Sequence, residues 1–277
     1  MFKSMMLIPH EKLKDDIKVF WFLEGLGKGN LIGCQKIIPD GCATVFIVLD
    51  GEINFSIYKN GKMKRGIYVH PPVMKSYVAY ASDNSYFIDI QLNPSVFYKL
   101  FNIAVEDLKD TMYTLEDLSI NFDSSFLERI YNCKHDKIKV YNELNSFLIE
   151  LFYKSEFYKN DSICSINKLY KDGDLDAFLK CQNLSVRQIE RNLKKITGLT
   201  PKALSRIGRF YSILDYIKFR EYNAEFKELA KEQNFSNHSH FIREFKSLTE
   251  ATPESFLNIN SQFPQYQGLC NLRQLKY

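Results

Sequence analysis

Short apolar runs separated by turn signals fill the first hundred residues. Runs rich in β-branched and aromatic residues lie at 19–23, 44–49, 54–58, 66–69, 77–80 and 86–92. Several short strands at this spacing predict an antiparallel barrel or sandwich. Asn60-Gly61 is a strong hairpin signal, so we expect the runs on its two sides to pair with each other.

The spacing of apolar positions changes to three and four after residue 94. Residues 94–103, 124–132 and 138–157 carry Val, Leu, Ile and Phe at this helical spacing. The polar stretch 155–163 follows them and is the best linker candidate. We therefore expect an α+β chain: a β-rich domain with trailing helices over 1–157, an all-α domain over 160–260 and a polar tail over 261–277.

The all-α domain contains one unit twice, at 174–204 and 225–257. Each copy predicts a short apolar helix, a link containing Asn183 or Asn234, a second amphipathic helix and a Thr-Pro pair. Residues 203–219 predict a long helix between the copies. Two short helices joined by such a turn form a helix-turn-helix, whose second helix enters the DNA major groove. Asparagine tolerates a left-handed backbone, so we expect the turns to form at these two residues.

The predicted recognition helices, near 185–197 and 237–248, each have one apolar and one polar face. Ile189, Leu193, Phe241 and Phe245 recur at helical spacing and face inward. The polar faces present the candidate base-reading residues Arg187, Gln188, Glu190, Arg191, His238, Ser239, His240 and Arg243. Arginine suits guanine, glutamine suits adenine and glutamate suits cytosine. Two alternatives stay open: an ordinary solvated face, and packing of His240 at the start of its helix.

Charge and composition narrow the class of protein. The formal net charge is +4 and the basic excess lies wholly in the C-terminal part, which is consistent with a polyanion partner. The six cysteines form no CxxC pair, as expected for free thiols in a reducing compartment. No apolar run reaches the roughly 20 residues of a membrane span, so we expect a cytoplasmic protein without a membrane partner.

The chain resembles the AraC/XylS family of bacterial transcription regulators. The motifs that carry the resemblance are LSVRQIERNLKKITGLTPK, the connecting IGRFYSILDYI, and ELAKEQNFSNHSHFIREFKSLTEATPESF. The stretches LIPHEKLKDDIKVFWFLEG and KIIPDGCATVFIVLDG are similar to the cupin-like amino-terminal domain of one branch of that family. In the first unit, the helix DLDAFLK is shorter than the family pattern.

The resemblance implies a sequence-specific regulator, an activator or a repressor, that binds double-stranded DNA. Arg187 and Arg191 match the family's base readers best, and Lys202 and Lys227 are candidate phosphate contacts that position the protein. The resemblance also implies a cupin-like domain that senses a small-molecule effector or mediates self-association as a homodimer, and contact with RNA polymerase.

Enzyme chemistry has little support in the amino-terminal domain. A metal-dependent cupin enzyme needs two or three histidines with a carboxylate, but His70 is the only histidine of the β-rich region apart from His10. We expect no catalytic residue, no metal and no cofactor. One alternative is a DNA-binding thiol or alkylation sensor using Cys34 or Cys42, although Cys42 sits at the edge of a buried-looking strand.

Overall fold

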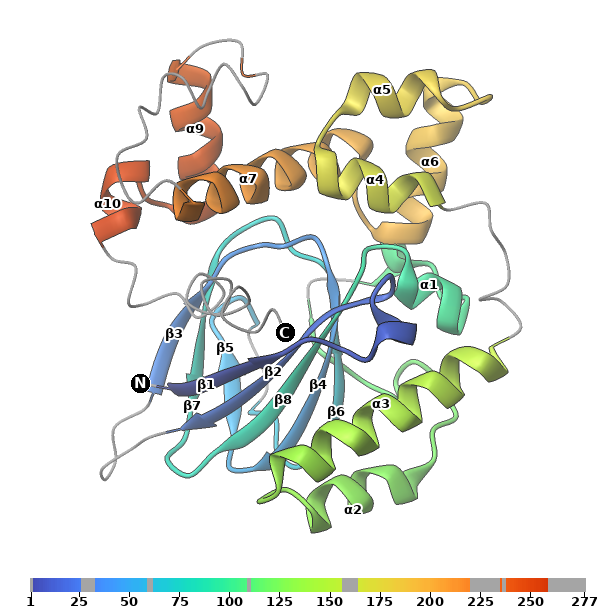
Figure 1. Cartoon of the computed structure of the whole chain (residues 1–277), viewed down its shortest axis with the longest axis vertical. Coiled ribbons are helices and arrows are strands. Elements are labelled where there is room, and N and C mark those ends of the chain that lie inside the picture. The colour runs from blue at the N-terminus through green and yellow to red at the C-terminus, as the bar shows by residue number, and fades with distance from the viewer. Residues whose placement is uncertain are drawn as a thin grey trace.

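The computed structural model describes residues 2–25, 33–58, 62–108, 111–155, 164–219, 235 and 238–258. It shows an α+β chain in which a β sandwich with trailing helices is followed by a helical part (Figure 1). The predicted fold class is confirmed. The expected domain boundary near 157–160, the first helix of the second unit, and the tail 261–277 lie outside the described residues.

Two antiparallel sheets form the sandwich within these ranges. The larger has the order β1-β2-β8-β4-β6-β9 and the smaller has the order β3-β7-β5. The strands are β1 (Phe2–Leu7), β2 (Ile17–Gly25), β3 (Gly33–Ile37), β4 (Ala43–Asp50), β5 (Ile53–Phe55), β6 (Gly66–His70), β7 (Tyr77–Ala81), β8 (Tyr86–Leu92) and β9 (Tyr113–Thr114).

Strand β8 is buried on both faces, so its alternate residues belong to two different cores. Ile88 and Ile90 pack with the apolar residues of the helices that cover the outer face of the larger sheet. Phe87 belongs to the core between the two sheets. Asp89 and Gln91 share the face of Phe87 by alternation, which places two polar side chains inside the sandwich.

The trailing helices cover one face of the larger sheet (Figure 1). They are α1 (Val96–Phe101), α2 (Ser124–Asn132) and α3 (Lys137–Lys154), with short 3-10 turns η1 (Glu11–Leu13) and η2 (Val105–Asp107). Asp123 and Asp136 cap α2 and α3 by accepting backbone N–H bonds. Val140, Leu144 and Leu148 recur every fourth residue and face the sheet, so the helical pattern read from the sequence sets the packing.

The helical part lies along one end of the sandwich, with α7 as its axis (Figure 1). Its elements are α4 (Cys164–Asp172), α5 (Leu175–Lys180), α6 (Val186–Thr197), α7 (Pro201–Phe219), α9 (His238–Thr249) and α10 (Pro253–Asn258). Gly208 lets α4 approach α7 closely, because a Cβ there would lie 2.6 Å from the carbonyl oxygen of Tyr170. No helix in the described ranges is long and apolar enough to cross a membrane.

One expectation about local structure is wrong. Strand β5 pairs with β7 in the smaller sheet and β6 pairs with β4 in the larger, so the runs beside Asn60-Gly61 do not form the predicted hairpin. An antiparallel bridge between Ile53 and Met63 is the pairing across that loop. The link between α5 and α6 contains Asn183 as expected, but Asn183 is not among the described residues with positive φ. Asn234 lies outside the described residues.

Candidate DNA interface and effector cavity

The first recognition helix, α6, starts at a reciprocal cap. The Ser185 hydroxyl accepts a hydrogen bond from the backbone N–H of Gln188 at 3.3 Å, and Gln188 Oε1 accepts from the backbone N–H of Ser185 at 3.0 Å. This capping box fixes the helix start and satisfies two backbone donors. The carboxamide oxygen of Gln188 is thereby engaged, by both the backbone N–H and the hydroxyl of Ser185.

The second recognition helix, α9, is tied to α7 through Glu244. The Glu244 carboxylate lies 3.4 Å from Arg206 Nε, 3.2 Å from Arg209 Nη2 and 3.3 Å from His240 Nε2. Its side chain is only 12% exposed, so the charge depends on these partners. The His240 ring also meets Phe235 edge-on, with centroids 5.6 Å apart. This is the packing arrangement that the sequence left open for His240.

Both recognition helices end in the same hydrogen-bonded turn. The hydroxyls of Thr197 and Thr249 donate to the carbonyl four residues earlier, at 2.8 and 2.9 Å. The N–H two residues later donates to the same hydroxyl, at 3.1 and 3.2 Å. The residue after each threonine is left-handed, with φ +71° at Gly198 and +59° at Glu250. The two units are therefore equivalent atom by atom at this turn.

The equivalence continues into the next helix of each unit. Thr200 and Thr252 accept the N–H of the residue three positions later, at 3.1 and 3.2 Å, and Pro201 and Pro253 occupy the first helical positions. Proline is suited to that position because it has no N–H to leave unpaired. The repeated Thr-Pro pair is thus the start signal of α7 and of α10.

The predicted readers occupy different environments. The exposed side chains are those of Arg187, Gln188, Glu190, Arg191, Ser239 and Arg243. His238 is half-buried, and its ring lies 6.2 Å from that of Phe241. Lys202 is exposed near the start of α7, whereas Lys227 lies outside the described residues. The exposed set includes one arginine at the equivalent position of each helix, Arg191 on α6 and Arg243 on α9.

The C-terminal end of each recognition helix contacts the amino-terminal part. A Cβ on Gly198, after α6, would lie 2.9 Å from Val105 Cγ1 of η2. Lys195 of α6 lies over the Tyr98 ring of α1, 5.4 Å from its centroid. After α9, the residue equivalent to Gly198 is Glu250, which forms an ion pair with Lys36 of β3 at 2.6 Å. The sandwich therefore contacts equivalent ends of α6 and α9 and constrains the position of both helices.

The segment 38–42, between β3 and β4, packs into the apolar cores of the helical part. Ile38 belongs to the core formed by α7, α9 and α10, and Cys42 belongs to the core formed by α4, α6 and α7. Gly41 has φ +71°, and a Cβ there would lie 2.9 Å from Ile207 of α7. We call residues 38–42 the rim segment. Its side chains complete cores that belong to the helical part of the chain.

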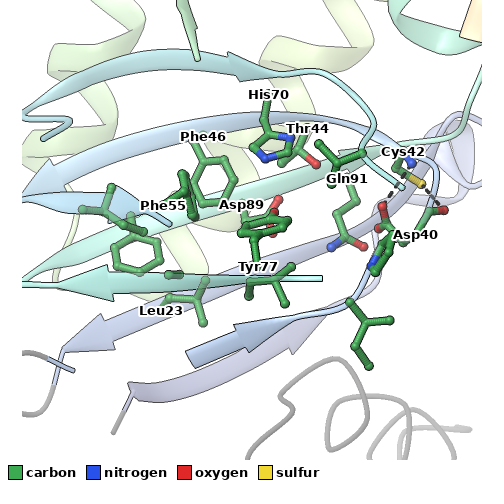
Figure 2. A pocket seen from close by; sticks show the side chains of 17 residues that line it. Leu23, Asp40, Cys42, Thr44, Phe46, Phe55, His70, Tyr77, Asp89 and Gln91 are labelled. Carbon is green, nitrogen blue, oxygen red and sulfur yellow. Dashed lines mark hydrogen bonds between the residues drawn. The ribbon is translucent and has the colours of Figure 1, made fainter. Parts of the chain in front are cut away.

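A cavity inside the sandwich opens beside the rim segment (Figure 2). Its volume is about 40 Å³, which is room for about three water molecules. Apolar lining comes mainly from Phe46, Phe55 and Tyr77. Polar lining comes from Asp40, Thr44, His70, Asp89 and Gln91. Ile38 and Cys42 of the rim segment also line it, so one segment touches both the cavity and the cores of the helical part.

Asp89 is the feature of this cavity that the sequence interpretation missed. It lies opposite Trp21 of β2 and Phe46 of β4 in the register of the larger sheet. Burial, and next the charge of Asp40, raise the pKa of Asp89 well above its ordinary value. In the run YFIDIQL, Asp89 and Gln91 alternate with Ile88 and Ile90, a pattern that predicts a polar face in solvent, so the burial of Asp89 does not follow from the sequence alone.

Cys42 is poorly suited to thiol sensing. Its side chain is buried, and its Sγ lies 3.4 Å from the Tyr170 hydroxyl. Burial raises the pKa of the Cys42 thiol to about 12, whereas reactive cysteines have lowered values. Cys34 lies in β3. The geometry at Cys42 therefore favours the reading of that residue as part of a core.

Groups of at least three His, Cys, Asp or Glu side chains that could hold a metal ion do not occur in the described part of the chain. The histidine of the cavity, His70, makes other contacts: its Nδ1 lies 2.6 Å from the Pro71 carbonyl oxygen, and its ring stacks on Tyr77 with centroids 5.3 Å apart. Since a carbonyl oxygen can only accept, Nδ1 of His70 carries a proton in this contact.

One family model matches the amino-terminal part of the chain. Residues 5–114 match the model of a family described as a domain of unknown function, DUF6597, and this match spans the sandwich from β1 to β9. No curated protein matches the chain.

Among solved structures the chain is similar to ToxT from Vibrio cholerae. A 1.65 Å structure of ToxT has 14% sequence identity and a TM-score of 0.44, with 93% of this chain and 98% of that chain covered. ToxT from Vibrio cholerae O395 bound to (E)-4-(8-methylnaphthalen-1-yl)but-3-enoic acid has 16% identity and a TM-score of 0.44, with the same shares covered. Wild-type ToxT bound to an unsaturated fatty acid has 16% identity and a TM-score of 0.41, with 93% and 94% covered.

Proposed function

We propose that this chain is an AraC-type transcription regulator that reads DNA with α6 and α9 and senses a small molecule in the sandwich cavity. The observation that carries the proposal is the repeat of the recognition unit. Two helices with the same terminal turn, and with an exposed arginine at the same position, are joined through α7. A duplicated reader of this kind suits two successive major-groove segments of one DNA site.

The charge on the exposed faces supports DNA as the partner. Arg187, Arg191 and Arg243 take part in none of the ion pairs found among the residues the structure describes, so their guanidinium groups are available for base edges. Each can donate two hydrogen bonds to guanine, and such a bidentate pair discriminates by about 1–3 kcal/mol. Lys202 is placed to contact a phosphate, which positions the protein without specifying sequence.

The rim segment supports the sensing role. A molecule in the cavity meets Ile38, Asp40 and Cys42, and two of these side chains are packed into the cores that carry α6 and α9. Lys18 of β2 adds a polar link, because its Nζ donates to the Tyr170 hydroxyl of α4 at 2.7 Å and lies 3.7 Å from Asp40. A ligand that moves the rim segment therefore disturbs the two apolar cores against which α6 and α9 pack.

Selection of random double-stranded DNA by the full chain tests the proposal. We expect enrichment of a bipartite motif whose two parts are separated by about one helical turn, 10–10.5 base pairs. Affinity for the enriched site should fall steeply with salt, because Lys and Arg contacts release counterions. A folded chain that enriches no sequence, and that binds no DNA at low salt, would refute the proposed function.

A further inference from the structure

The sandwich cavity has an unusual balance of charge for its size. Two carboxylates, Asp40 and Asp89, are among its lining residues, whereas Lys and Arg are missing from the described residues that line it. Asp40 already has a cationic partner outside the cavity, Lys18, 3.7 Å away. Asp89 is 9% exposed, and its Oδ1 accepts no hydrogen bond from the residues that the structure describes.

The groups around Asp89 favour a positively charged donor. Figure 2 shows the Asp89 side chain among Phe46, Tyr77 and Gln91, with His70 above it. The faces of Phe46 and Tyr77 attract cations through their ring quadrupoles.

An anion would be disfavoured at this position. It would have to replace its water shell beside Asp89 without a lysine or arginine among the described lining residues to compensate. A metal ion also lacks a ligand set in the described part of the chain. An organic ammonium group instead brings three N–H donors, a charge that restores the ionised form of Asp89, and an apolar stem for the aromatic walls.

We propose that the cavity beside Asp89 binds the ammonium group of a small primary amine, and that this amine is the effector of the regulator. The regulatory meaning rests on the proposed function, while the binding itself does not. The cavity volume of about 40 Å³ limits the buried part of the ligand to a few heavy atoms. Because Ile38 and Cys42 line the same cavity, a bound amine contacts the rim segment directly.

Three ligands of similar size and different charge test this inference on the full chain: ethylammonium, ethanol and acetate. Each is titrated at constant ionic strength and followed by saturation-transfer NMR. A ligand of three or four heavy atoms reaches at best about millimolar affinity. We expect ethylammonium to bind about tenfold or more tightly than either other ligand, as a charge-assisted hydrogen bond implies. Equal or tighter binding of ethanol or acetate would overturn the inference.

Asp89→Asn supplies the matched variant, because it keeps the shape of the side chain and removes its charge. We expect this variant to lose about tenfold or more of its ethylammonium affinity and to keep its ethanol affinity. Asp172→Asn, at an exposed position of α4, is the control and should bind ethylammonium as the original chain does. Retained ethylammonium affinity in Asp89→Asn would overturn the inference, and the comparison of three ligands stands without the variant.

DNA affinity is measured separately by mobility shift, with and without ethylammonium at equal ionic strength. A chain that binds DNA without preferring the amine refutes this inference alone. A chain that binds no DNA refutes the proposed regulator, whatever the NMR titration shows. Amine binding that changes DNA affinity supports both.

Discussion

Lys36 of β3 and Glu250, the residue after α9, form an ion pair between the sandwich and the second recognition unit, with Nζ 2.6 Å from Oε2. Glu250 adopts φ +59°, a conformation that costs a residue with a side chain about 1 kcal/mol or more. The Glu250 side chain is 62% exposed, so the ion pair contributes little to stability. One residue thus combines backbone strain with a weak contact.

Substitution of Glu250 separates these two effects. Glu250→Gly relieves the strain and should raise the free energy of unfolding by about 0.5–1 kcal/mol, net of the greater freedom of glycine in the unfolded chain. Glu250→Ala keeps the strained φ and should lower it by about 0.5 kcal/mol. Urea denaturation measures both, with Lys36→Ala as the control for the pair alone. A loss of stability in Glu250→Gly would mean that the ion pair outweighs the strain.

The equivalent positions of Arg191 and Arg243 predict equivalent losses of DNA recognition. Alanine at either position should weaken the specific site by about 1–3 kcal/mol and relax preference at one base pair. Lys202→Ala should weaken all sequences alike and reduce the salt slope by about one counterion. Mobility shifts on single-base variants of the site make the comparison. Equal losses of affinity for all DNA sequences in Arg243→Ala would identify Arg243 as a phosphate contact. Unchanged affinity and base preference in Arg191→Ala would mean that α9 alone recognises the sequence.

The thiol-sensor alternative predicts modification of Cys42, which the structure opposes. With a pKa of about 12, about one Cys42 thiol in ten thousand is ionised at pH 8. Brief treatment with iodoacetamide followed by peptide mass mapping should label the exposed Cys181 and spare Cys42. Rapid labelling of Cys42 together with a change in DNA affinity would instead support the sensor.

Asp89 predicts a pH dependence of stability with a definite sign. Its raised pKa means that the folded chain holds this proton more tightly than the unfolded chain, so ionisation destabilises the fold as pH rises from the ordinary aspartate range through the folded pKa. Asp89→Asn removes that loss. The variant should gain on the original chain between pH 4 and pH 8, with the smallest difference at pH 4.

The urea midpoint is measured at each pH for Asp89→Asn and for the original chain. The difference between the two midpoints isolates the contribution of Asp89 to the pH dependence of stability. The other titratable groups around it keep their own pH dependence in both proteins, and these are Asp40, His70, Tyr77, Cys42 and, through Asp40, Lys18. A difference that does not change with pH would show that Asp89 is not protonated more readily in the folded chain.

Local sequence signals predicted the positions of helices and strands better than they predicted which strands pair with each other. The runs at 124–132 and 86–92 correspond to α2 and β8 because helical spacing and β-branched composition act within one segment. The Asn60-Gly61 signal did not predict the pairing, because β5 joins β7 in the smaller sheet and β6 joins β4 in the larger sheet. Strand β1 was missed, since it has the pattern of an edge strand and becomes a strand by pairing with β2.

The candidate site was predictable where it depends on one helix and unpredictable where it depends on contacts between elements that are far apart in the sequence. The exposure of Arg187, Arg191 and Arg243 follows from helical spacing alone. Glu244 reads as one more solvent-facing charge, and its role appears only when Arg206 and Arg209 of α7 are placed beside it. Asp89 likewise needed the second sheet, which closes a polar cavity over its side chain.

The seating of residues 38–42 limits how such a protein can be recombined. Ile38 and Cys42 are 2% exposed, and their neighbours lie in the helical part of the chain. A hybrid that joins this sandwich to the helical part of another protein would place Ile38 and Cys42 against a surface whose shape does not match them. The segment must therefore be transplanted together with the helices that pack against it.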